Sequence, residues 1–417
     1  MRSPAGENPP TPLPQTPPAL LEAGTPAYRR ATMGIFVGGF ATFATLYGTQ
    51  PILPLLHDVF GVSAATASLT VSAGTAALAL LLIPASVLSD RIGRVRVMQV
   101  SLLLAGLISL ASAFVTDFNQ LLVLRTLLGA ALAGMPAAAM AYLGEEIAPT
   151  SQGRAMGLYI AGNALGGMSG RLLSALFTEW VSWRFALGAL GVIGCLAALL
   201  FWMRLPASRH FRPRAARLGR IWQDTRAIYA DPGMPWLFLT AFLLMGAFVG
   251  LYNFLGFRLM AAPFNLSQAA VGAIFILYLV GTWGSTTGGK LADRHGRRNI
   301  LWIMVAVMGA GLAATLANSL VVVIGGVAVF TFGFFAAHSV ASGWVGRRAL
   351  ERRGLAAALY LCSYYFGASV LGSLSGLAWT NYQWPGVAAV LAASVLITFA
   401  FSTVMLRRLP PKSMADN

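Results

Sequence analysis

Two arginines, Arg125 and Arg171, lie inside long apolar runs of the chain. An arginine at mid-depth of a membrane costs at least about 2.5–3.5 kcal/mol, so it normally faces a partner or a water-filled cavity. In a cavity the two guanidinium groups would favour neutral or anionic ligands. The structural alternatives are that Arg171 extends to the nearer membrane surface, and that Arg125 forms an ion pair or binds backbone carbonyls.

Titratable groups that could carry a proton are scarce, since none of the 13 acidic residues falls in the middle of an apolar run. The candidates for proton coupling are Asp58, Glu145, Glu146 and His338. A desolvated carboxyl group can titrate near neutral pH, and histidine does so in water. The alternative for His338 is a hydrogen-bonded structural role.

Uncharged polar and aromatic side chains complete the set that could bind a ligand. They occupy the first, seventh and eleventh apolar runs, where ordinary helix packing is an equally good interpretation. The candidates for the cavity wall are Tyr47, Gln50, Tyr252, Asn253, Tyr364 and Tyr365.

The elements that position these side chains are twelve apolar runs. The chain is 57% hydrophobic and 10% charged, whereas a soluble domain carries about 25% charged residues. Runs of about 20 residues have the length that spans a membrane. We expect an all-α membrane protein with transmembrane helices near 31–54, 65–88, 96–115, 119–143, 154–177, 183–203, 236–257, 269–289, 299–317, 320–344, 355–378 and 386–406.

A charged sequence repeats between these runs. Asp90-Arg91-Ile92-Gly93-Arg94 returns 203 positions later (293 − 90) as Asp293-Arg294-His295-Gly296-Arg297. Each copy follows the second run in a set of six, which predicts two pseudo-symmetric six-helix bundles around a central cavity. The glycines Gly93 and Gly296 permit tight turns.

The predicted bundles are flanked and joined by polar segments. Eight prolines and the lack of an apolar core predict that the first segment is disordered. The expected parts are a tail at 1–28, an N-terminal bundle at 29–204, a basic linker at 205–235, a C-terminal bundle at 236–407 and a tail at 408–417.

The net charge of +16 is sorted by loop, which argues against a nucleic-acid partner. Lysine and arginine concentrate in alternate loops, so the positive-inside rule predicts that both termini are cytoplasmic. The cysteines, Cys195 and Cys362, and the dispersed histidines predict no metal or cofactor site. The chain has no phosphate-binding loop with Lys and Ser/Thr, so ATP is not the expected energy source.

The second charged loop is similar to the signature loop of the major facilitator superfamily. Gly289-Lys290-Leu291-Ala292-Asp293-Arg294-His295-Gly296-Arg297-Arg298 matches the family pattern at nearly every position, whereas the first copy has Ser86 in place of the leading glycine. Arg125-Thr126-Leu127-Leu128-Gly129 resembles the family's second motif. The resemblance covers roughly residues 30–407.

The fifth run resembles a glycine-rich motif of proton-driven antiporters in the same superfamily. The motif residues are Gly157 and Gly162-Asn163-Ala164-Leu165-Gly166-Gly167, with Asn163 where proline is usual. Gly162, Gly166 and Gly170 also lie at steps of four, so they share one helix face and permit close helix approach. Packing alone is the structural alternative for this motif.

The resemblance implies that the charged loops act as a gate on the cytoplasmic side. In this arrangement Asp90 lies near Arg353 at the start of the eleventh run, and Asp293 lies near Arg154 at the start of the fifth. Each charge–dipole contact contributes about 0.3–1 kcal/mol when it is exposed. The alternative is a basic loop that only fixes membrane topology.

The leading expectation is a secondary transporter of a bacterial inner membrane, which exports small organic molecules in exchange for protons. The resemblance implies alternating access and a monomer. An importer of small organic anions is the alternative within transport. A membrane-embedded enzyme or receptor is the alternative from another class, but the chain has neither clustered metal ligands nor a large soluble signalling domain.

Overall fold

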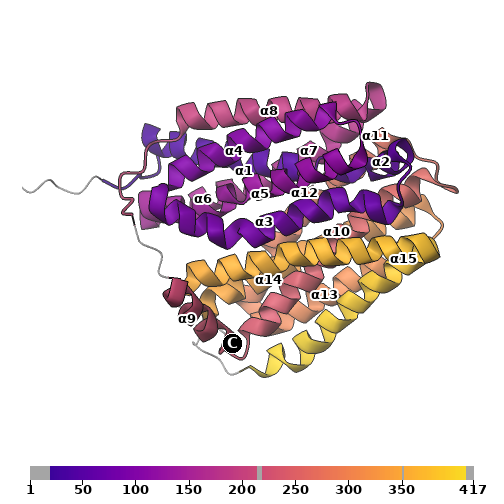
Figure 1. Cartoon of the computed structure of the whole chain (residues 1–417). Helices are drawn as coiled ribbons and strands as arrows, with labels where there is room; N and C mark the ends of the chain where they lie inside the picture. Colours follow the sequence, from indigo (N-terminus) through magenta and orange to yellow (C-terminus); the bar gives the residue numbers. More distant parts are fainter. Residues whose placement is uncertain (1–18, 214–217, 350–351, 410–417) are drawn as a thin grey trace, which may run out of the picture.

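The computed structural model describes residues 19–213, 218–349 and 352–409. Helices dominate these ranges (Figure 1). The helices of the first half are α1 (Pro26–Leu46), α2 (Leu53–Phe60), α3 (Ala64–Ile92), α4 (Arg94–Ala111), α5 (Phe118–Leu132), α6 (Gly134–Glu146), α7 (Pro149–Trp180) and α8 (Trp183–Arg204).

The second half begins after a linker helix, α9 (Leu218–Tyr229). Its helices are α10 (Met234–Met260), α11 (Gln268–Ala273), α12 (Tyr278–His295), α13 (Arg297–Ala314), α14 (Leu320–Arg348) and α15 (Arg353–Val404), with a short 3-10 turn, η3 (Ile274–Leu277), between α11 and α12.

Twelve spans can be counted in the described residues. Ten stretches are long and apolar enough to cross a membrane. One of them contains α15, in which the non-helical backbone at Gln383 separates two helices. The remaining span is α7, whose glycines and two arginines, Arg154 and Arg171, lower its hydropathy. The predicted all-α fold of twelve spans is confirmed.

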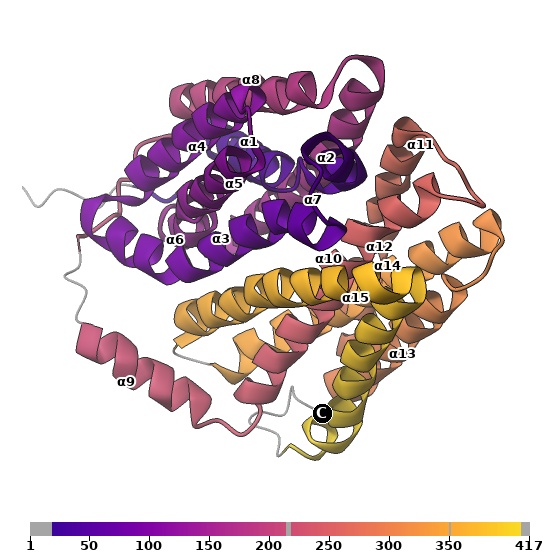
Figure 2. The same ribbon diagram turned by 45° about the vertical axis from the view of Figure 1, so that its right-hand side comes forward.

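The two halves lie side by side as separate bundles (Figures 1 and 2). Corresponding helices pack alike. A Cβ at Gly166 of α7 would lie 2.1 Å from the carbonyl oxygen of Phe40 in α1, and a Cβ at Gly367 of α15 would lie 1.9 Å from that of Phe242 in α10. The offsets of 201 (367 − 166) and 202 (242 − 40) show that these seams are equivalent positions of one repeat.

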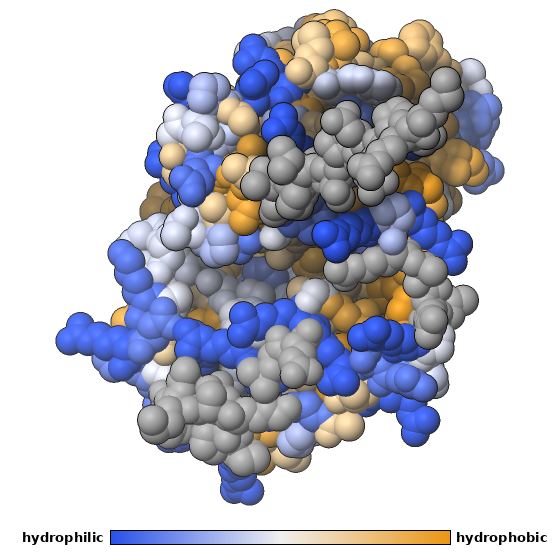
Figure 3. Space-filling model, turned by 90° about the vertical axis from the view of Figure 1, so that its left-hand side faces the viewer, coloured by the Kyte–Doolittle hydropathy of each residue, from blue (hydrophilic) through white to orange (hydrophobic). Residues whose placement is uncertain are grey.

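The two ends of the molecule differ in charge. The basic end carries the two charged loops, 90–94 and 293–297, together with α9, and the far end carries α2 and α11 (Figure 1). Figure 3 looks onto the basic end. Hydrophilic side chains gather on this face, and its surface is hollowed between the two halves.

The halves close on each other at the far end. Between described residues, the hydrogen bonds that join them extend from the far end to mid-depth only. The donor and acceptor pairs are Ala269 N to Glu179 Oε2 at 3.2 Å, Gln268 Nε2 to the Pro51 carbonyl at 2.8 Å, Gln50 Nε2 to Asn253 Oδ1 at 2.8 Å and Cys362 Sγ to the Ala79 carbonyl at 3.3 Å. The molecule is therefore open toward the basic end.

Residues 19–28 are folded, whereas the sequence predicted a disordered segment over 1–28. The backbone of Leu21 donates to the Glu146 carbonyl at 2.8 Å and accepts from Ala148 N at 3.0 Å, and Ala23 N donates to Ser151 Oγ. These bonds fix residues 19–25 on the turn between α6 and α7, and Thr25 caps α1. Residues 1–18 and 410–417 lie outside the described ranges.

Candidate functional site

The first span is interrupted where the site is built. Regular helix stops at Leu46, and a 3-10 turn at Gln50–Ile52 leads into α2. Pro51 has no N–H and cannot continue the helical hydrogen-bond ladder, so carbonyls just before it need other donors. Inside a membrane these donors must come from the protein.

Arg125 of α5 supplies most of these donors. Its guanidinium donates to the carbonyl of Thr45 at 3.0 Å, to that of Leu46, and to that of Thr70 in α3 at 3.1 Å. The side chain is 1% exposed, and no acidic residue pairs with it in the described part of the chain. The geometry therefore shows the backbone-binding role among the alternatives considered for Arg125.

Ser174 of α7 completes the support of the break. Its hydroxyl donates to the Gly48 carbonyl at 2.6 Å. The equivalent residue in the second half is Ser375 (375 − 174 = 201), which lies beside Gly250 of the unbroken α10. The Ser375 hydroxyl, by contrast, has no partner among the described residues. The break is thus a departure from the repeat.

Arg171 lies at the meeting point of the two halves. Its Nε donates to Gln50 Oε1 at 2.5 Å, and its Nη1 donates to the Gly167 carbonyl at 2.6 Å. Gln50 Nε2 in turn donates to Asn253 Oδ1 of α10 at 2.8 Å. These three side chains, Arg171, Gln50 and Asn253, are named the relay. All are nearly fully buried, so Arg171 does not extend to the membrane surface.

Aromatic rings surround the guanidinium of Arg171. Its carbon lies 4.1 Å from the ring centre of Tyr47, 5.0 Å from that of Tyr278 and 5.4 Å from that of Phe275. Such cation–π contacts stabilise a buried cation by about 2 kcal/mol when desolvated. No carboxylate pairs with Arg171 among the described residues, so its positive charge is not neutralised by an acid.

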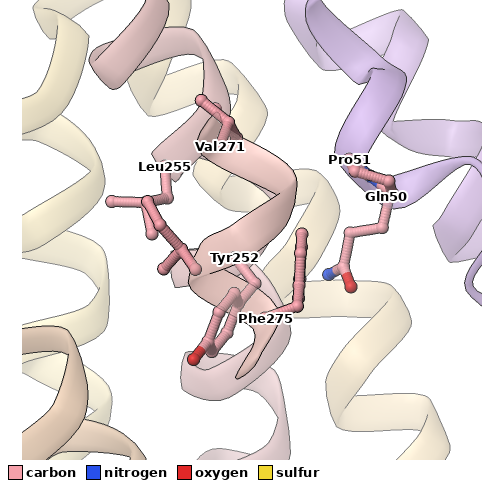
Figure 4. Close-up of a pocket in the computed structure, with 8 residues that line it drawn as sticks. Gln50, Pro51, Tyr252, Leu255, Val271 and Phe275 are labelled. Atoms are coloured by element: carbon pink, nitrogen blue, oxygen red, sulfur yellow. The ribbon is translucent and has the colours of Figure 1, made fainter. Parts of the chain in front are cut away.

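A small cavity adjoins the relay (Figure 4). Its volume of about 10 Å³ holds about one water molecule. The side chain of Gln50 lies on one side of it and the second half forms the other (Figure 4). The lining residues are Gln50, Pro51, Tyr252, Leu255, Gly256, Val271, Ile274 and Phe275.

A series of ring contacts connects this site with His338. Tyr278 contacts Phe248 at 5.4 Å between ring centres, Phe248 contacts Phe334 at 3.9 Å, and Phe334 contacts His338 at 6.0 Å. The Tyr360 hydroxyl lies 3.0 Å from His338 Nδ1. His338 is hydrogen-bonded, and it lies within the membrane-spanning part of α14.

The structure separates the predicted wall residues into two groups. Tyr47, Gln50, Tyr252 and Asn253 meet around Arg171, whereas Tyr364 and Tyr365 belong to the group around His338, with Tyr364 at 4.8 Å from its ring centre. The sequence reasoning missed Phe275 and Tyr278, since they carry no motif. Their position opposite the break becomes evident only when the halves are packed together.

The acidic candidates for proton coupling lie at the ends of the bundle. Asp58 is at the far end, 3.7 Å from His57, with its side chain 74% exposed. Glu145 pairs with Arg94 at 2.9 Å. Glu146 accepts from Ser208 Oγ at 2.5 Å and lies 3.0 Å from His210 Nδ1. Of the four candidates, only His338 lies deep in the bundle.

The charged loops do not pair crosswise in this structure, contrary to the expected gate. Asp90 binds Arg94 at 2.5 Å, and Asp293 binds Arg297 at 2.7 Å and Arg347 at 3.2 Å, all within one half. The physical reason is that the halves are apart at the basic end.

The arginines expected to pair with Asp293 and Asp90 across the halves, Arg154 and Arg353, are exposed. Arg154 and Arg353 make no ion pair with a described residue, and Arg91 and Arg294 point to the surface. Gly93 and Gly296 have φ of 107° and 83°, which a side chain would resist. Gly289 approaches only Ser339, at 3.8 Å from a built Cβ.

Some glycines of α7 contact the backbone of α1 and others do not. A Cβ at Gly162 or Gly170 would lie 2.4 Å from the backbone of α1, compared with 2.1 Å at Gly166. Gly167 instead faces Arg171, and Gly157 has nothing within 4 Å. Asn163 Oδ1 is buried without a described partner, facing Gly39 of α1.

Comparisons with known proteins agree with this architecture. The family model described as Major Facilitator Superfamily matches residues 35–259 and 237–417. The Inner membrane transport protein YnfM of Escherichia coli (strain K12) is 45% identical over 393 residues, which is 94% of this chain and 94% of that protein. The Uncharacterized MFS-type transporter YybF of Bacillus subtilis (strain 168) is 43% identical, covering 94% of this chain and 98% of that protein.

A solved structure shows the same fold. A bacterial homolog to the human lysosomal transporter Spinster, in an inward-facing and occupied conformation, superposes with a TM-score of 0.74 at 17% identity, covering 92% of this chain and 95% of that one. With the twelve spans, the repeated halves and the charged loops, these matches identify a multi-pass membrane transporter. The chain belongs to the major facilitator superfamily.

Proposed function

We propose that the protein is a secondary active transporter that exports small organic molecules, anionic or neutral, by alternating access in exchange for protons. In this proposal it acts as a monomer in a bacterial inner membrane, and its basic end and both termini face the cytoplasm. The lysine and arginine content of the loops at that end supports this orientation.

The observation that carries the proposal is the buried charge of Arg171. An arginine held by rings and an amide, with no described carboxylate, has a positive charge that an anionic ligand would neutralise. Desolvated ions favour such pairing, because an unpaired buried charge is costly. The site lies where both halves contribute residues, as alternating access requires.

Export requires a state that is open to the cytoplasm, and in the proposed orientation the open basic end provides this state. In the proposed orientation, the hollow between the halves admits a ligand from the cytoplasm (Figure 3). His338 is the proposed proton carrier, since it is the titratable candidate that lies deep in the bundle. It is joined to the Arg171 site by a series of ring contacts.

The decisive experiment is transport by purified protein in liposomes with an imposed pH gradient. A panel of small carboxylates, their amides and lipophilic cations is tested in both gradient directions. We expect carboxylates or neutral compounds to move against their own gradient when protons move the opposite way. Strong preference for lipophilic cations would contradict the substrate class, and accumulation along with protons would favour the importer of small organic anions.

A further inference from the structure

Gln50 uses both ends of its amide at the seam between the halves. Its oxygen accepts from Arg171 Nε of α7, and its nitrogen donates to Asn253 Oδ1 of α10. The two donors point in the same direction, from Arg171 to Gln50 within the first half and from Gln50 to Asn253 of the second half, so each bond polarises the next. Gln50 thus links the buried charge to the contact that helps to close the far end.

Gln50 also lies where the first span departs from a regular α-helix. It belongs to the 3-10 turn of the broken first span, and the carbonyl of the next residue, Pro51, accepts the cross-half bond from Gln268. The small cavity described above lies directly beside both residues (Figure 4). A displacement of Gln50 therefore affects two successive cross-half bonds, and it meets empty space instead of packed atoms.

We infer that Gln50 is the switch through which an anionic ligand opens the far end. A carboxylate carries a negative charge and can accept two parallel hydrogen bonds from a guanidinium, which an amide oxygen cannot do, so it displaces Gln50 Oε1 from Arg171. Gln50 then leaves Asn253, and the far-end contact is lost. Asn253 Nδ2 is buried without a described acceptor and offers the arriving ligand a second donor.

This inference rests on the proposed function, which supplies the anionic ligand and the two states, and it adds the residue that couples them. In an exporter loaded from the basic end, ligand binding must be what opens the opposite end. The neutral Gln50 amide bound to Arg171 meets this need, because it keeps the far end closed until a stronger hydrogen-bond acceptor binds the arginine.

The test measures how often the far end opens. Val271 lines the small cavity and is 3% exposed, so Val271→Cys reacts with a membrane-impermeant maleimide only when the far end opens. The background is Cys195→Ser with Cys362→Ser, since the chain has no other cysteines. Gln50→Glu is the main variant, because it supplies a carboxylate to Arg171 from within and cannot donate to Asn253 when ionised.

We expect Gln50→Glu to raise the labelling rate about two- to tenfold, the range for loss of one buried hydrogen bond. Gln50→Ala and Asn253→Ala should raise it similarly. Thr49→Val is the matched control, since the neighbouring Thr49 hydroxyl is buried without a described partner and should label like the parent. Monodisperse elution confirms that each variant is folded.

Two results separate this inference from the proposed function. In the parent, benzoate should raise labelling and benzamide should not, and Gln50→Glu should no longer respond to benzoate. Equal labelling of Gln50→Glu and Thr49→Val, with carboxylate transport intact in liposomes, would overturn the switch and keep the proposed function. If Gln50→Glu is labelled faster but the parent protein transports no carboxylate, the role of Gln50 in holding the far end closed is supported and anionic transport is refuted.

Discussion

At the residue scale, the buried arginines Arg125 and Arg171 have different roles because they have different hydrogen-bond and ring partners. Arg125 donates to three backbone carbonyls, two of which, those of Thr45 and Leu46, lie just before the break in the first span. Arg171 is held by aromatic rings and by a side-chain amide. The first arrangement stabilises the fold, whereas in the proposed function the second provides a charge for a ligand.

Arg125→Lys should therefore destabilise the protein. A lysine ammonium cannot reach three carbonyls in the fixed geometry of a guanidinium, and each buried acceptor left unpaired costs about 1–3 kcal/mol. The measurement is the temperature at which half of the detergent-purified protein loses monodisperse elution. Arg184→Lys, on an exposed arginine at the far end, is the control. A melting temperature equal to that of the control would refute the backbone role.

Arg171→Gln should instead remove transport. Loss of a charge-assisted hydrogen bond of about 1.5–3 kcal/mol predicts a decrease of roughly 10- to 100-fold in carboxylate uptake by liposomes at low substrate concentration. Arg184→Gln should transport normally. If Arg171→Gln moves carboxylates as well as the parent does, the guanidinium does not contact the ligand.

The sequence identified both arginines as unusual but could not distinguish their roles. Hydropathy places each one inside a span, and a span carries no information on what its neighbours offer. The partners of Arg125 are backbone carbonyls of α1 and α3, at least 55 residues away in the sequence (125 − 70). The rings around Arg171 come mainly from the opposite half, so only the packed structure shows them.

At the element scale, the α1–α7 seam is a close backbone contact that depends on glycine. We predict that Gly166→Ala lowers stability, because its Cβ would lie 2.1 Å from the Phe40 carbonyl oxygen, where neither backbone can yield without shifting a helix. Gly157→Ala in the same helix has open space around it and should be neutral or slightly stabilising, because alanine favours helix by about 1 kcal/mol. Thermal denaturation of the two variants, with Gly367→Ala as the symmetry-related test, compares them directly. Equal stability of Gly166→Ala and Gly157→Ala would contradict the close contact.

The elements themselves were largely predictable, because length and hydropathy report membrane crossing directly. The twelve spans and the two-fold repeat followed from the apolar runs and from the charged loops. Two features did not follow. Residues 19–25 follow a proline-rich stretch and are too few to show a helix or strand pattern, so their docking on the turn after α6 had no signal. Likewise, crosswise pairing of the loops is a property of one state of the transporter, and a sequence does not specify which state is observed.

At the scale of the whole molecule, the charged loops do not pair across the halves and the far end is closed. Both observations describe one state of the transporter, the one open at the basic end. We propose that Asp90 contacts the start of α15 when the basic end closes, as the family resemblance implies. Asp90→Asn should then slow transport severalfold, since a contact of about 0.3–1 kcal/mol is lost from the closed state. The present state loses the ion pair with Arg94, but Arg94 keeps its pair with Glu145, so surface expression and thermal stability should change little. Asp224→Asn, an acid at the same end outside the repeat, is the comparison. Transport by Asp90→Asn at the parent rate would remove the loop from the gate.

Energy coupling is also a property of the whole molecule, because the titrating group and the ligand site must sense each other across the C-terminal half. If His338 carries the proton, His338→Gln should abolish accumulation driven by a pH gradient, since no other candidate lies deep in the bundle. Exchange of labelled for unlabelled substrate at equal concentrations needs no net proton movement, so it should persist. Tyr360→Phe removes only the hydroxyl 3.0 Å from Nδ1 and should shift the pH dependence of transport without abolishing it. Uphill transport by His338→Gln at the parent level would exclude His338 as the carrier and move the search to the acidic residues at the ends of the bundle.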